Sequence, residues 1–450
     1  EAQAQEAKAE TLPARAPFPA LAWQVAGQLA RAAPAADASV ISTLDAPLQR
    51  RLEALAAETA KAQGTDATAA IMVVEIRSRA VRAAVASAGL DRPGGWIDMT
   101  RALRSPGSAL KPFIYAFAFD DGIAAPDTVI QDRPKRFADY QPENFDRVFH
   151  GQVTAREALN YSLNMPAVAT LDRIGPQVFL SRLESAGVRL VRPRAGLSDP
   201  GLSLALGGEG ITMRDMAVLY AALGNDGLAK PLAFTEDLAA RRPTQGGVRL
   251  VRADSARQIL DILRETPTPK GRAPAALTQG GPRMAFKTGT SYGFRDAVAA
   301  GVVGGYALVV WTGRADGGAR GGLTGRDAAL PLLFDAADAL IAPDSAAHPI
   351  APKQAPAALA HLPQENDGPR LIFPPDGAAV QVDGLGPGAR GLVLAALGDH
   401  LTWYVDGAPL PPDPATGQMI WRPRAAGFYR LEAVDAEGRA AAARVRVKAE

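Results

Sequence analysis

The stretch RMAFKTGTSYGFRDAVAAGVVGGYALVVWT, residues 283–312, follows a period of two in three short runs. The runs cover residues 284–291, 296–303 and 306–312, and Gly304-Gly305 is typical of a tight hairpin turn. An apolar segment at residues 327–341 predicts a helix that covers the resulting antiparallel sheet. We therefore expect an α+β domain in which a sheet lies against helices.

The chain before this sheet is predicted to be mostly helical. Ala-rich segments run from about residue 108 to 220, and two of them open with the capping pattern Thr-x-x-acid, at Thr154 to Glu157 and at Thr212 to Asp215. Further upstream we predict a strand, a helix and a two-stranded hairpin, over residues 40–44, 46–63, 69–75 and 80–86.

Composition divides the chain into four segments. Residues 1–39 are rich in Ala, Glu and Pro and are predicted to be an interdomain linker region with one short amphipathic piece near residues 21–31. The α+β domain follows at residues 40–342, and residues 343–369 are a second predicted linker.

Residues 370–450 contain short alternating segments between Gly, Pro and Asp turns, which predicts a small all-β sandwich domain. We expect strands at residues 427–434 and 441–447. The aromatic residues of this domain are predicted to form its core rather than a binding patch; they are Trp403, Tyr404, Trp421 and Phe428.

Charge and composition exclude several classes of function. A net charge of +2, from 49 basic and 47 acidic residues, argues against a nucleic-acid partner. The chain has no cysteine, and its four histidines show no ligand spacing, so we expect neither a metal nor another cofactor. No apolar run reaches the roughly 20 residues that span a bilayer.

A first candidate motif is Ser105-Pro106-Gly107-Ser108-Ala109-Leu110-Lys111. Pro and Gly break the chain and an apolar helix follows, so Ser108 lies at a helix N-terminus, where backbone N–H groups favour an oxyanion. At positions i and i+3, the Ser108 hydroxyl and the Lys111 amine share one helix face within hydrogen-bonding reach. Burial in an apolar helix would lower the pKa of Lys111 and make it a base.

Two further motifs follow. Tyr161-Ser162-Leu163-Asn164 could place a second hydroxyl against Lys111 and an amide against a substrate peptide. Phe286-Lys287-Thr288-Gly289-Thr290-Ser291 lies on a predicted strand, where Gly289 leaves room for a substrate to pair with the edge. Lys287, Thr288 and Thr290 would bind a carboxylate. Each motif alone is equally typical of a solvated helix, a loop or a protected edge strand.

The order Ser-x-x-Lys, Ser-x-Asn, Lys-Thr-Gly is the set given for penicillin-binding proteins and serine β-lactamases. The chain resembles class A penicillin-binding proteins in particular, over about residues 11–341 and onward into a small β-domain of the kind that ends one branch of the family. The resemblance includes the segments at residues 42–45, 104–108, 142–145, 206–210 and 287–296. Val298 departs from it, because an aromatic residue is expected there.

The resemblance implies a peptidoglycan D,D-transpeptidase. By its first motif, the resemblance makes Ser108 the acylated nucleophile and Lys111 the base. By the second, it makes Ser162 the proton relay and Asn164 a substrate holder. By the third, the site for the substrate and its carboxylate consists of Lys287, Thr288, Gly289 and Thr290. The backbone N–H groups of Ser108 and Thr290 would form the oxyanion hole.

Partners and location are also implied by the resemblance. Stem peptides would be the substrates, β-lactams covalent inhibitors, and cell-wall synthesis proteins possible partners of the β-domain. The chain would be a periplasmic fragment of a bifunctional enzyme, whose glycosyltransferase domain and inner-membrane anchor lie upstream.

Two other classes stay open. A D,D-carboxypeptidase or β-lactamase shares the motifs but must activate water, and no separate deacylation base is evident. A non-catalytic periplasmic peptide-binding or scaffold protein would keep the fold without the chemistry.

Overall fold

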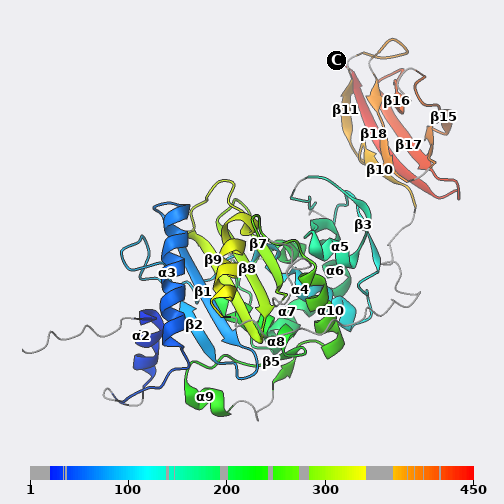
Figure 1. Ribbon diagram of the computed structural model, residues 1–450. Helices are drawn as coiled ribbons and strands as arrows, with labels where there is room; N and C mark the ends of the chain where they lie inside the picture. The colour runs from blue at the N-terminus through cyan, green and yellow to red at the C-terminus, as the bar shows by residue number, and fades with distance from the viewer. Residues whose placement is uncertain are drawn as a thin grey trace, which may run out of the picture. The chain divides into compact units, whose positions relative to one another are not determined.

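The computed structural model describes residues 21–33, 35, 38–137, 141–145, 147–192, 201–241, 247–272, 283–340, 368–382, 384–389, 391–398, 400–414 and 417–449. The chain divides into two units between Leu362 and Pro363. In Figure 1 the first unit runs from blue to yellow and the second is orange to red.

The first unit is built on a five-stranded sheet in the order β2-β1-β9-β8-β7, in which all pairs are antiparallel. Its strands are β1 (Ala67–Glu75), β2 (Val81–Val85), β7 (Ala285–Thr290), β8 (Asp296–Val303) and β9 (Tyr306–Arg314). The predicted hairpin and the three predicted strands are confirmed. Gly304 and Gly305 have φ of 53° and 83°, as a two-residue turn with positive φ at both positions requires.

Helices cover both faces of this sheet (Figure 1). On one face lie α3 (Ala46–Gln63), the short helix η3 (Gly325–Ala329) and α11 (Leu330–Asp338), in a core that contains Leu52 and Ile71. Met72, the next residue of β1, belongs to the core on the opposite face. Because both faces are covered, β1 is apolar along nearly its whole length instead of alternating.

The opposite face carries the larger helical layer. Among the described residues its helices are α2 (Trp23–Ala32), α4 (Lys111–Asp120), α5 (Ala155–Asn160), α6 (Asn164–Ile174), α7 (Pro176–Ser185), α8 (Met213–Gly224) and α10 (Ala253–Arg264), with the turns η1 (Gly107–Leu110) and η2 (Leu202–Leu206). The short helix α9 (Glu236–Arg241) packs apart from this core, through Ala239 against Ala80 and Ala233. Two short ribbons join these helices, β3 (Val129–Asp132) with β4 (Gly151–Thr154), and β5 (Leu228–Ala229) with β6 (Val248–Arg249). None of the described helices is long and apolar enough to cross a bilayer.

Local capping explains where two of these helices begin. The Thr154 hydroxyl accepts the Glu157 N–H at 3.2 Å, and the Glu157 carboxylate accepts the Thr154 N–H at 2.8 Å. At α8, the Thr212 hydroxyl accepts the Asp215 N–H at 3.0 Å. Both predicted helix starts are confirmed, because a capped first turn satisfies its own free N–H groups without help from the rest of the fold.

Three predictions need correction. Residues 40–44 form no strand, only an isolated bridge between Ser42 and Thr235, because the outer edge of β2 pairs instead with the segment at Ala233, whose carbonyl oxygen accepts the Val81 N–H at 2.9 Å. The predicted helix at residues 327–341 becomes η3 followed by α11, with Pro331 at the start of α11. The amphipathic piece near residues 21–31 is α2, and Val25 is buried in the domain core, so the linker interpretation does not describe this helix.

The second unit contains a five-stranded sheet in the order β11-β18-β17-β14-β15. Two ribbons accompany it, β10 with β13 and β12 with β16. The strands are β10 (Arg370–Phe373), β11 (Ala379–Val382), β12 (Leu392–Val393), β13 (Ala395–Leu397), β14 (Thr402–Val405), β15 (Ala408–Leu410), β16 (Ile420–Trp421), β17 (Gly427–Val434) and β18 (Ala440–Ala449). All pairs are antiparallel except β11 with β18.

The predicted aromatic core of this unit is confirmed only in part. Trp403 and Trp421 are buried together with Leu431 and Val445. Phe428 is 78% exposed, since it points away from that core on β17. The linker predicted at residues 343–369 lies outside the described residues except for its last two.

The packing of α3 leads to a stability prediction. Leu52 is fully buried against the sheet, whereas Leu55 on the same helix is only partly buried. We expect Leu52→Ala to lower the free energy of unfolding by about 2–5 kcal/mol, because a cavity replaces the side chain. Leu55→Ala should cost clearly less. Urea unfolding of the full chain, followed by the helical circular dichroism signal, measures both; equal losses would contradict the packing.

Candidate active site

The turn that carries Ser108 is pressed against the edge of the sheet. Ser108 lies in η1, which continues directly into α4 at Lys111. Gly107 has φ of 50°, and a Cβ there would lie 2.5 Å from the Thr290 carbonyl oxygen on β7. Ser108 is half-buried and Lys111 is fully buried. The predicted helix start is confirmed, and only glycine allows this approach to β7.

Lys111 reaches across to the turn that begins α6. Its Nζ donates to the carbonyl oxygens of Ser162 at 2.6 Å and Leu163 at 3.0 Å, and to Asn164 Oδ1 at 2.6 Å. Within the described residues no hydrogen bond joins Lys111 Nζ to Ser108 Oγ, so the bond expected from their spacing is not formed. Three acceptors surround the amine, which matches the three hydrogens of an ammonium group.

The electrostatic surroundings of Lys111 favour loss of its proton. Burial is the largest influence and lowers the pKa of Lys111 well below its ordinary value. The positive charge of Lys287 lowers the pKa further, while the negative charge of Asp132 raises it. The balance is a lowered pKa, which is the property that a general base on a lysine side chain needs.

Lys287 approaches the same turn from the sheet. It is buried on β7, and its Nζ donates to Ser162 Oγ at 2.8 Å and to the Thr288 carbonyl oxygen at 3.0 Å. Burial, with a smaller contribution from the charge of Arg326, lowers the pKa of Lys287 to about 7. The Ser162 hydroxyl was expected to face Lys111; instead its carbonyl faces Lys111 and its hydroxyl faces Lys287. The two buried amines are thus linked through one residue.

Strand β7 presents the third motif at an open edge of the sheet. Alternation places Lys287 and Gly289 on the face toward the helical layer and Thr288 and Thr290 on the other. A Cβ at Gly289 would lie 2.0 Å from the Pro106 carbonyl oxygen, so this glycine makes room for the Ser108 turn rather than for a substrate strand. Thr290 Oγ1 accepts the Gly325 N–H at 2.8 Å and keeps its own O–H to donate.

A second glycine contact fixes the Ser108 turn from the other side. A Cβ at Gly207 would lie 2.4 Å from the Gly107 nitrogen, and the Ser105 hydroxyl donates to the Gly207 carbonyl oxygen at 2.8 Å. The turn is therefore held between Gly207 and β7. Such rigid support is what a reactive hydroxyl requires for a fixed direction of attack.

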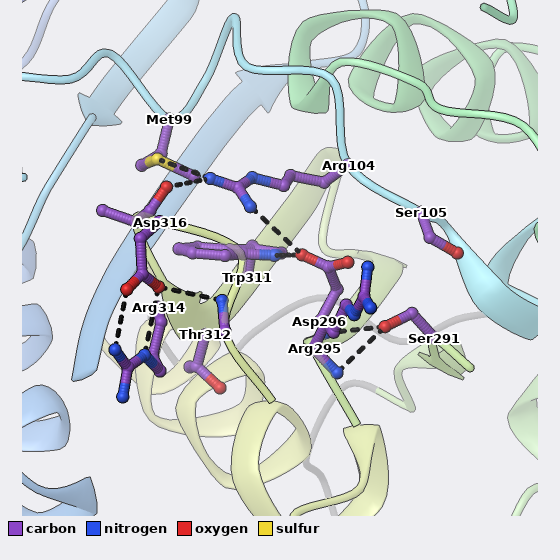
Figure 2. Close-up of polar contacts among 12 residues, drawn as sticks. Met99, Arg104, Ser105, Ser291, Arg295, Asp296, Trp311, Thr312, Arg314 and Asp316 are labelled. Carbon is purple, nitrogen blue, oxygen red and sulfur yellow. Dashed lines mark hydrogen bonds and ion pairs between the residues drawn. The ribbon is translucent and has the colours of Figure 1, made fainter. Parts of the chain in front are cut away.

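Figure 2 shows how the chain just before this turn is tied to the sheet. The Arg104 guanidinium lies 5.2 Å from the Trp311 ring centre and 4.0 Å from Asp296 Oδ1, and donates to the Ala315 carbonyl oxygen. Trp311 Nε1 donates to Asp296 Oδ1 at 2.9 Å. Trp311 is also the register partner of Val298, and both are buried, so Val298 contributes to the core and the large aromatic ring lies on the neighbouring strand.

Two residues in the site had no role in the sequence analysis. Asn144 was noticed only as part of residues 142–145, and Asp132 was not noticed. Asn144 accepts the Asn164 N–H, and its Nδ2 donates to Asp132. In the sequence, Asp132 ends a short alternating segment and Asn144 follows in a polar loop. This pattern is too common to single out either residue.

The described residues contain no group of three or more His, Asp or Glu side chains that could hold a metal ion. The site offers a hydroxyl at a helix N-terminus, two buried amines with lowered pKa, and an open strand edge.

Comparison with known proteins agrees with this arrangement. Residues 69–315 match the family described as the penicillin binding protein transpeptidase domain, and residues 358–447 match the Penicillin-Binding Protein C-terminus Family. Penicillin-binding protein 1C of Escherichia coli (strain K12) is 40% identical over 302 residues, which cover 65% of this chain and 37% of that protein. Penicillin-binding protein 1F of Bacillus subtilis (strain 168) is 28% identical over 285 residues, covering 60% and 38%.

The fold has solved counterparts. The structure of the PonA1 protein from Mycobacterium tuberculosis in complex with penicillin V aligns with a TM-score of 0.59 at 20% identity, covering 73% of this chain and 92% of that one. The chain spans less than two fifths of the length of the two curated relatives named above. The sheet, the helical layer and the order of the motifs agree with the transpeptidase match, which covers more than half of the 450 residues. This chain therefore belongs to the penicillin-binding protein transpeptidase family.

Proposed function

We propose that this chain is a serine D,D-transpeptidase, in which Ser108 is acylated by a D-Ala-D-Ala stem peptide and a second stem peptide resolves the acyl-enzyme. The observation that carries the proposal is that Ser162 joins the two buried lysines, Lys111 through its carbonyl and Lys287 through its hydroxyl. In this proposal Lys111 is the base and Ser162 the proton donor, and their contact beside the Ser108 helix start supports these roles.

In the first step, Ser108 Oγ attacks the carbonyl carbon of the penultimate D-Ala while Lys111 Nζ takes the hydroxyl proton. Lys111 must be neutral at that moment, which its lowered pKa supports. A neutral Lys111 amine has two hydrogens for three acceptors, so one of the three contacts must be released. The lone pair of the nitrogen is then available to the Ser108 hydroxyl. Catalytic hydrogen bonds commonly tighten only with substrate, so the present lack of a contact with Ser108 does not oppose this role.

Collapse of the tetrahedral intermediate breaks the D-Ala–D-Ala amide bond. The leaving amine needs a proton, and the Ser162 hydroxyl can supply one and regain it from Lys287, its 2.8 Å donor. The backbone N–H groups of Ser108 and Thr290 are the proposed oxyanion donors. In the second step, an amine of another stem peptide attacks the ester carbon and its proton passes through the Ser162 hydroxyl back to Lys287. The ester bond breaks as the proton held on Lys111 returns to Ser108 Oγ, so that one amide bond replaces another and both lysines regain their starting state.

Substrate recognition is assigned to the β7 edge. An extended peptide can pair with the open side of β7. The terminal carboxylate would then meet Lys287 and the hydroxyls of Thr288 and Thr290, with Asn164 beside the peptide. The match to penicillin-binding relatives, one of them solved with penicillin V, supports β-lactams as mimics of this substrate.

The same resemblance supports a place on the periplasmic side of the inner membrane for the parent protein. It also supports the second unit, which matches the C-terminus family of penicillin-binding proteins, as the contact surface for cell-wall synthesis proteins.

Acylation of Ser108 can be measured directly. A fluorescent penicillin should label the full chain once, and the mass of the adduct should map to the peptide that contains Ser108. Ser108→Ala should lose labelling on the order of 10³-fold or more, because no neighbouring hydroxyl shares its position at the helix start. Ser185→Ala is the matched control and should keep the labelling, because this exposed serine ends α7, where its hydroxyl donates to the Arg182 carbonyl oxygen. Undiminished labelling of Ser108→Ala would overturn the assignment.

The two lowered lysine pKa values lead to a pH prediction. Acylation requires neutral Lys111, so the rate should rise as pH increases through its pKa. Carboxylate binding requires charged Lys287, so the rate should fall as pH increases through about 7. The second-order rate constant for penicillin should therefore rise with pH while Lys111 loses its proton and fall above about pH 7, where Lys287 loses its charge.

A control for this profile is Lys287→Arg. Arginine keeps its charge throughout the measured pH range but cannot return a proton to Ser162. The rate should therefore be lower at every pH, while the fall on the alkaline side disappears. A wild-type rate that does not change with pH would contradict the proposed roles of both lysines.

The lifetime of the adduct separates a transpeptidase from a hydrolase. We expect the penicilloyl ester on Ser108 to persist for minutes or longer in intact-mass measurements, because the described site contains no carboxylate hydrogen-bonded to Ser108, Lys111 or Ser162 that would activate water. A parallel sample denatured before penicillin is added gives the unlabelled baseline. Release within seconds would point to a β-lactamase instead.

A further inference from the structure

Asp132, the last residue of β3, is a carboxylate with no exposed surface. Within the described residues, its hydrogen-bond donors are neutral: Asn144 Nδ2 at 2.9 and 2.8 Å to the two oxygens, and the His150 backbone N–H at 2.8 Å. A buried carboxylate with only neutral donors is costly to the fold unless something else compensates its charge. The mechanism proposed above gives this residue no role.

Asp132 fixes the orientation of the Asn144 amide. A carboxylate only accepts hydrogen bonds, so the NH₂ group of Asn144 must face it and the amide oxygen must point the other way. That oxygen accepts the Asn164 N–H at 2.8 Å. Asn164 in turn accepts from Lys111 through Oδ1 at 2.6 Å and donates through Nδ2 to the Glu143 carbonyl oxygen at 2.6 Å. Two amides therefore connect Asp132 to Lys111.

The turn held by this chain needs outside support. Ser162 has φ of 60°, a left-handed conformation that a non-glycine residue adopts at a cost of about 1 kcal/mol or more. In this conformation its carbonyl contacts Lys111 and its hydroxyl contacts Lys287. The Asn144 contact to the Asn164 N–H anchors the turn two residues later.

We propose that Asp132, acting through Asn144, is a positioning residue for acyl transfer, which locks the Ser162 to Asn164 turn onto Lys111 and supplies a buried negative charge near that lysine. The inference rests on the proposed function for its catalytic consequence, whereas the locking of the turn stands on the contacts themselves. It gives a role to the Asn of residues 142–145, which the motif set leaves without one.

The charges around Lys111 define the electrostatic part of this role. Lys287 faces it from β7 and Asp132 from β3, while its direct contacts on the turn are neutral carbonyl and amide oxygens. Burial raises the pKa of Tyr115, one turn along α4, and the negative charge of Asp132 raises it further. Among the residues that the structure describes, Asp132 is thus the carboxylate that opposes the lowering of the Lys111 pKa.

The test compares Asp132→Asn with Asp120→Asn in the full chain. Asp132→Asn keeps the shape but loses the charge and the forced orientation of Asn144. We expect its acylation rate constant at neutral pH to fall about 10- to 100-fold, because the turn is displaced. The rising, acidic side of its pH profile should also shift to lower pH by on the order of one unit, since a charge that favours protonated Lys111 is gone.

Asp120 is the matched control, because it lies at the far end of α4 and binds the Arg252 N–H and the Ser255 hydroxyl. Asp120→Asn should leave the pH profile in place. A purely structural role for Asp132 would lower the rate at every pH without a shift. An Asp132→Asn variant with the wild-type rate and profile would overturn the proposal.

A second variant and a second readout keep the outcomes separate. Asn144→Ser keeps the Asp132 charge but breaks the hydrogen-bonded link from Asp132 to Asn164. It should therefore lower the acylation rate without shifting the acidic side of the pH profile, and it replaces Asp132→Asn if that variant does not fold. Hydrogen exchange measured by mass spectrometry reports the Asn164 N–H directly. Exchange there should be at least about 10-fold faster in either variant than in Asp120→Asn, whether or not penicillin reacts.

These readouts distinguish the two proposals. Failure of the wild-type chain to acylate would overturn the proposed function, while faster exchange at Asn164 would still uphold the positioning role. Unchanged exchange at Asn164 in both variants would overturn the positioning role even if the wild-type chain reacts with penicillin.

Discussion

The candidate site depends on the meeting of two buried amines at Ser162. Lys111 comes from the helical layer and Lys287 from the sheet, and each uses a different polar group of the same residue. Burying two ammonium groups side by side is unfavourable, because each loses hydration and each repels the other. The fold accepts this cost where lowered pKa values are useful, which is why such pairs occur at functional sites more often than elsewhere.

The layered architecture makes that meeting possible. The sheet carries Lys287 on its edge strand, and the helical layer carries Ser108, Lys111 and the turn at Ser162. Gly107, Gly207 and Gly289 let the backbones of these parts approach more closely than any side chain would permit. A Cβ at Gly107 or Gly289 would push the Ser108 turn away from β7, and a Cβ at Gly207 would press on the turn from its other side. The spacing between nucleophile and strand therefore depends on the absence of these side chains.

Charge balance in this site is achieved over several residues. The described contacts of Lys111 are carbonyl and amide oxygens, and Asp132 acts on it from a distance through Asn144 and Asn164. An adjacent carboxylate would pair with Lys111, raise its pKa and remove its use as a base. A carboxylate placed behind two neutral amides lets the site keep a buried negative charge for balance while Lys111 stays easy to deprotonate.

The sequence alone was sufficient for features with short-range causes. The hairpin at Gly304-Gly305, the helix at residues 46–63 and the capped starts at Thr154 and Thr212 were all predicted, because turn, periodicity and cap act within a few residues. The three motifs were found for the same reason, and their order indicated the family that the comparisons confirm.

Only the tertiary structure decided which groups meet. Lys111 and Ser162 are 51 residues apart in the chain, and Ser162 and Lys287 are 125 apart. Three contacts come from packing between the layers. They are the bond of the Ser162 hydroxyl with Lys287, the close approach of Gly289 to Pro106, and the link from Asp132 through Asn144 to Asn164. No local pattern encodes such contacts, because burial and direction are set by how the sheet and the helices pack together.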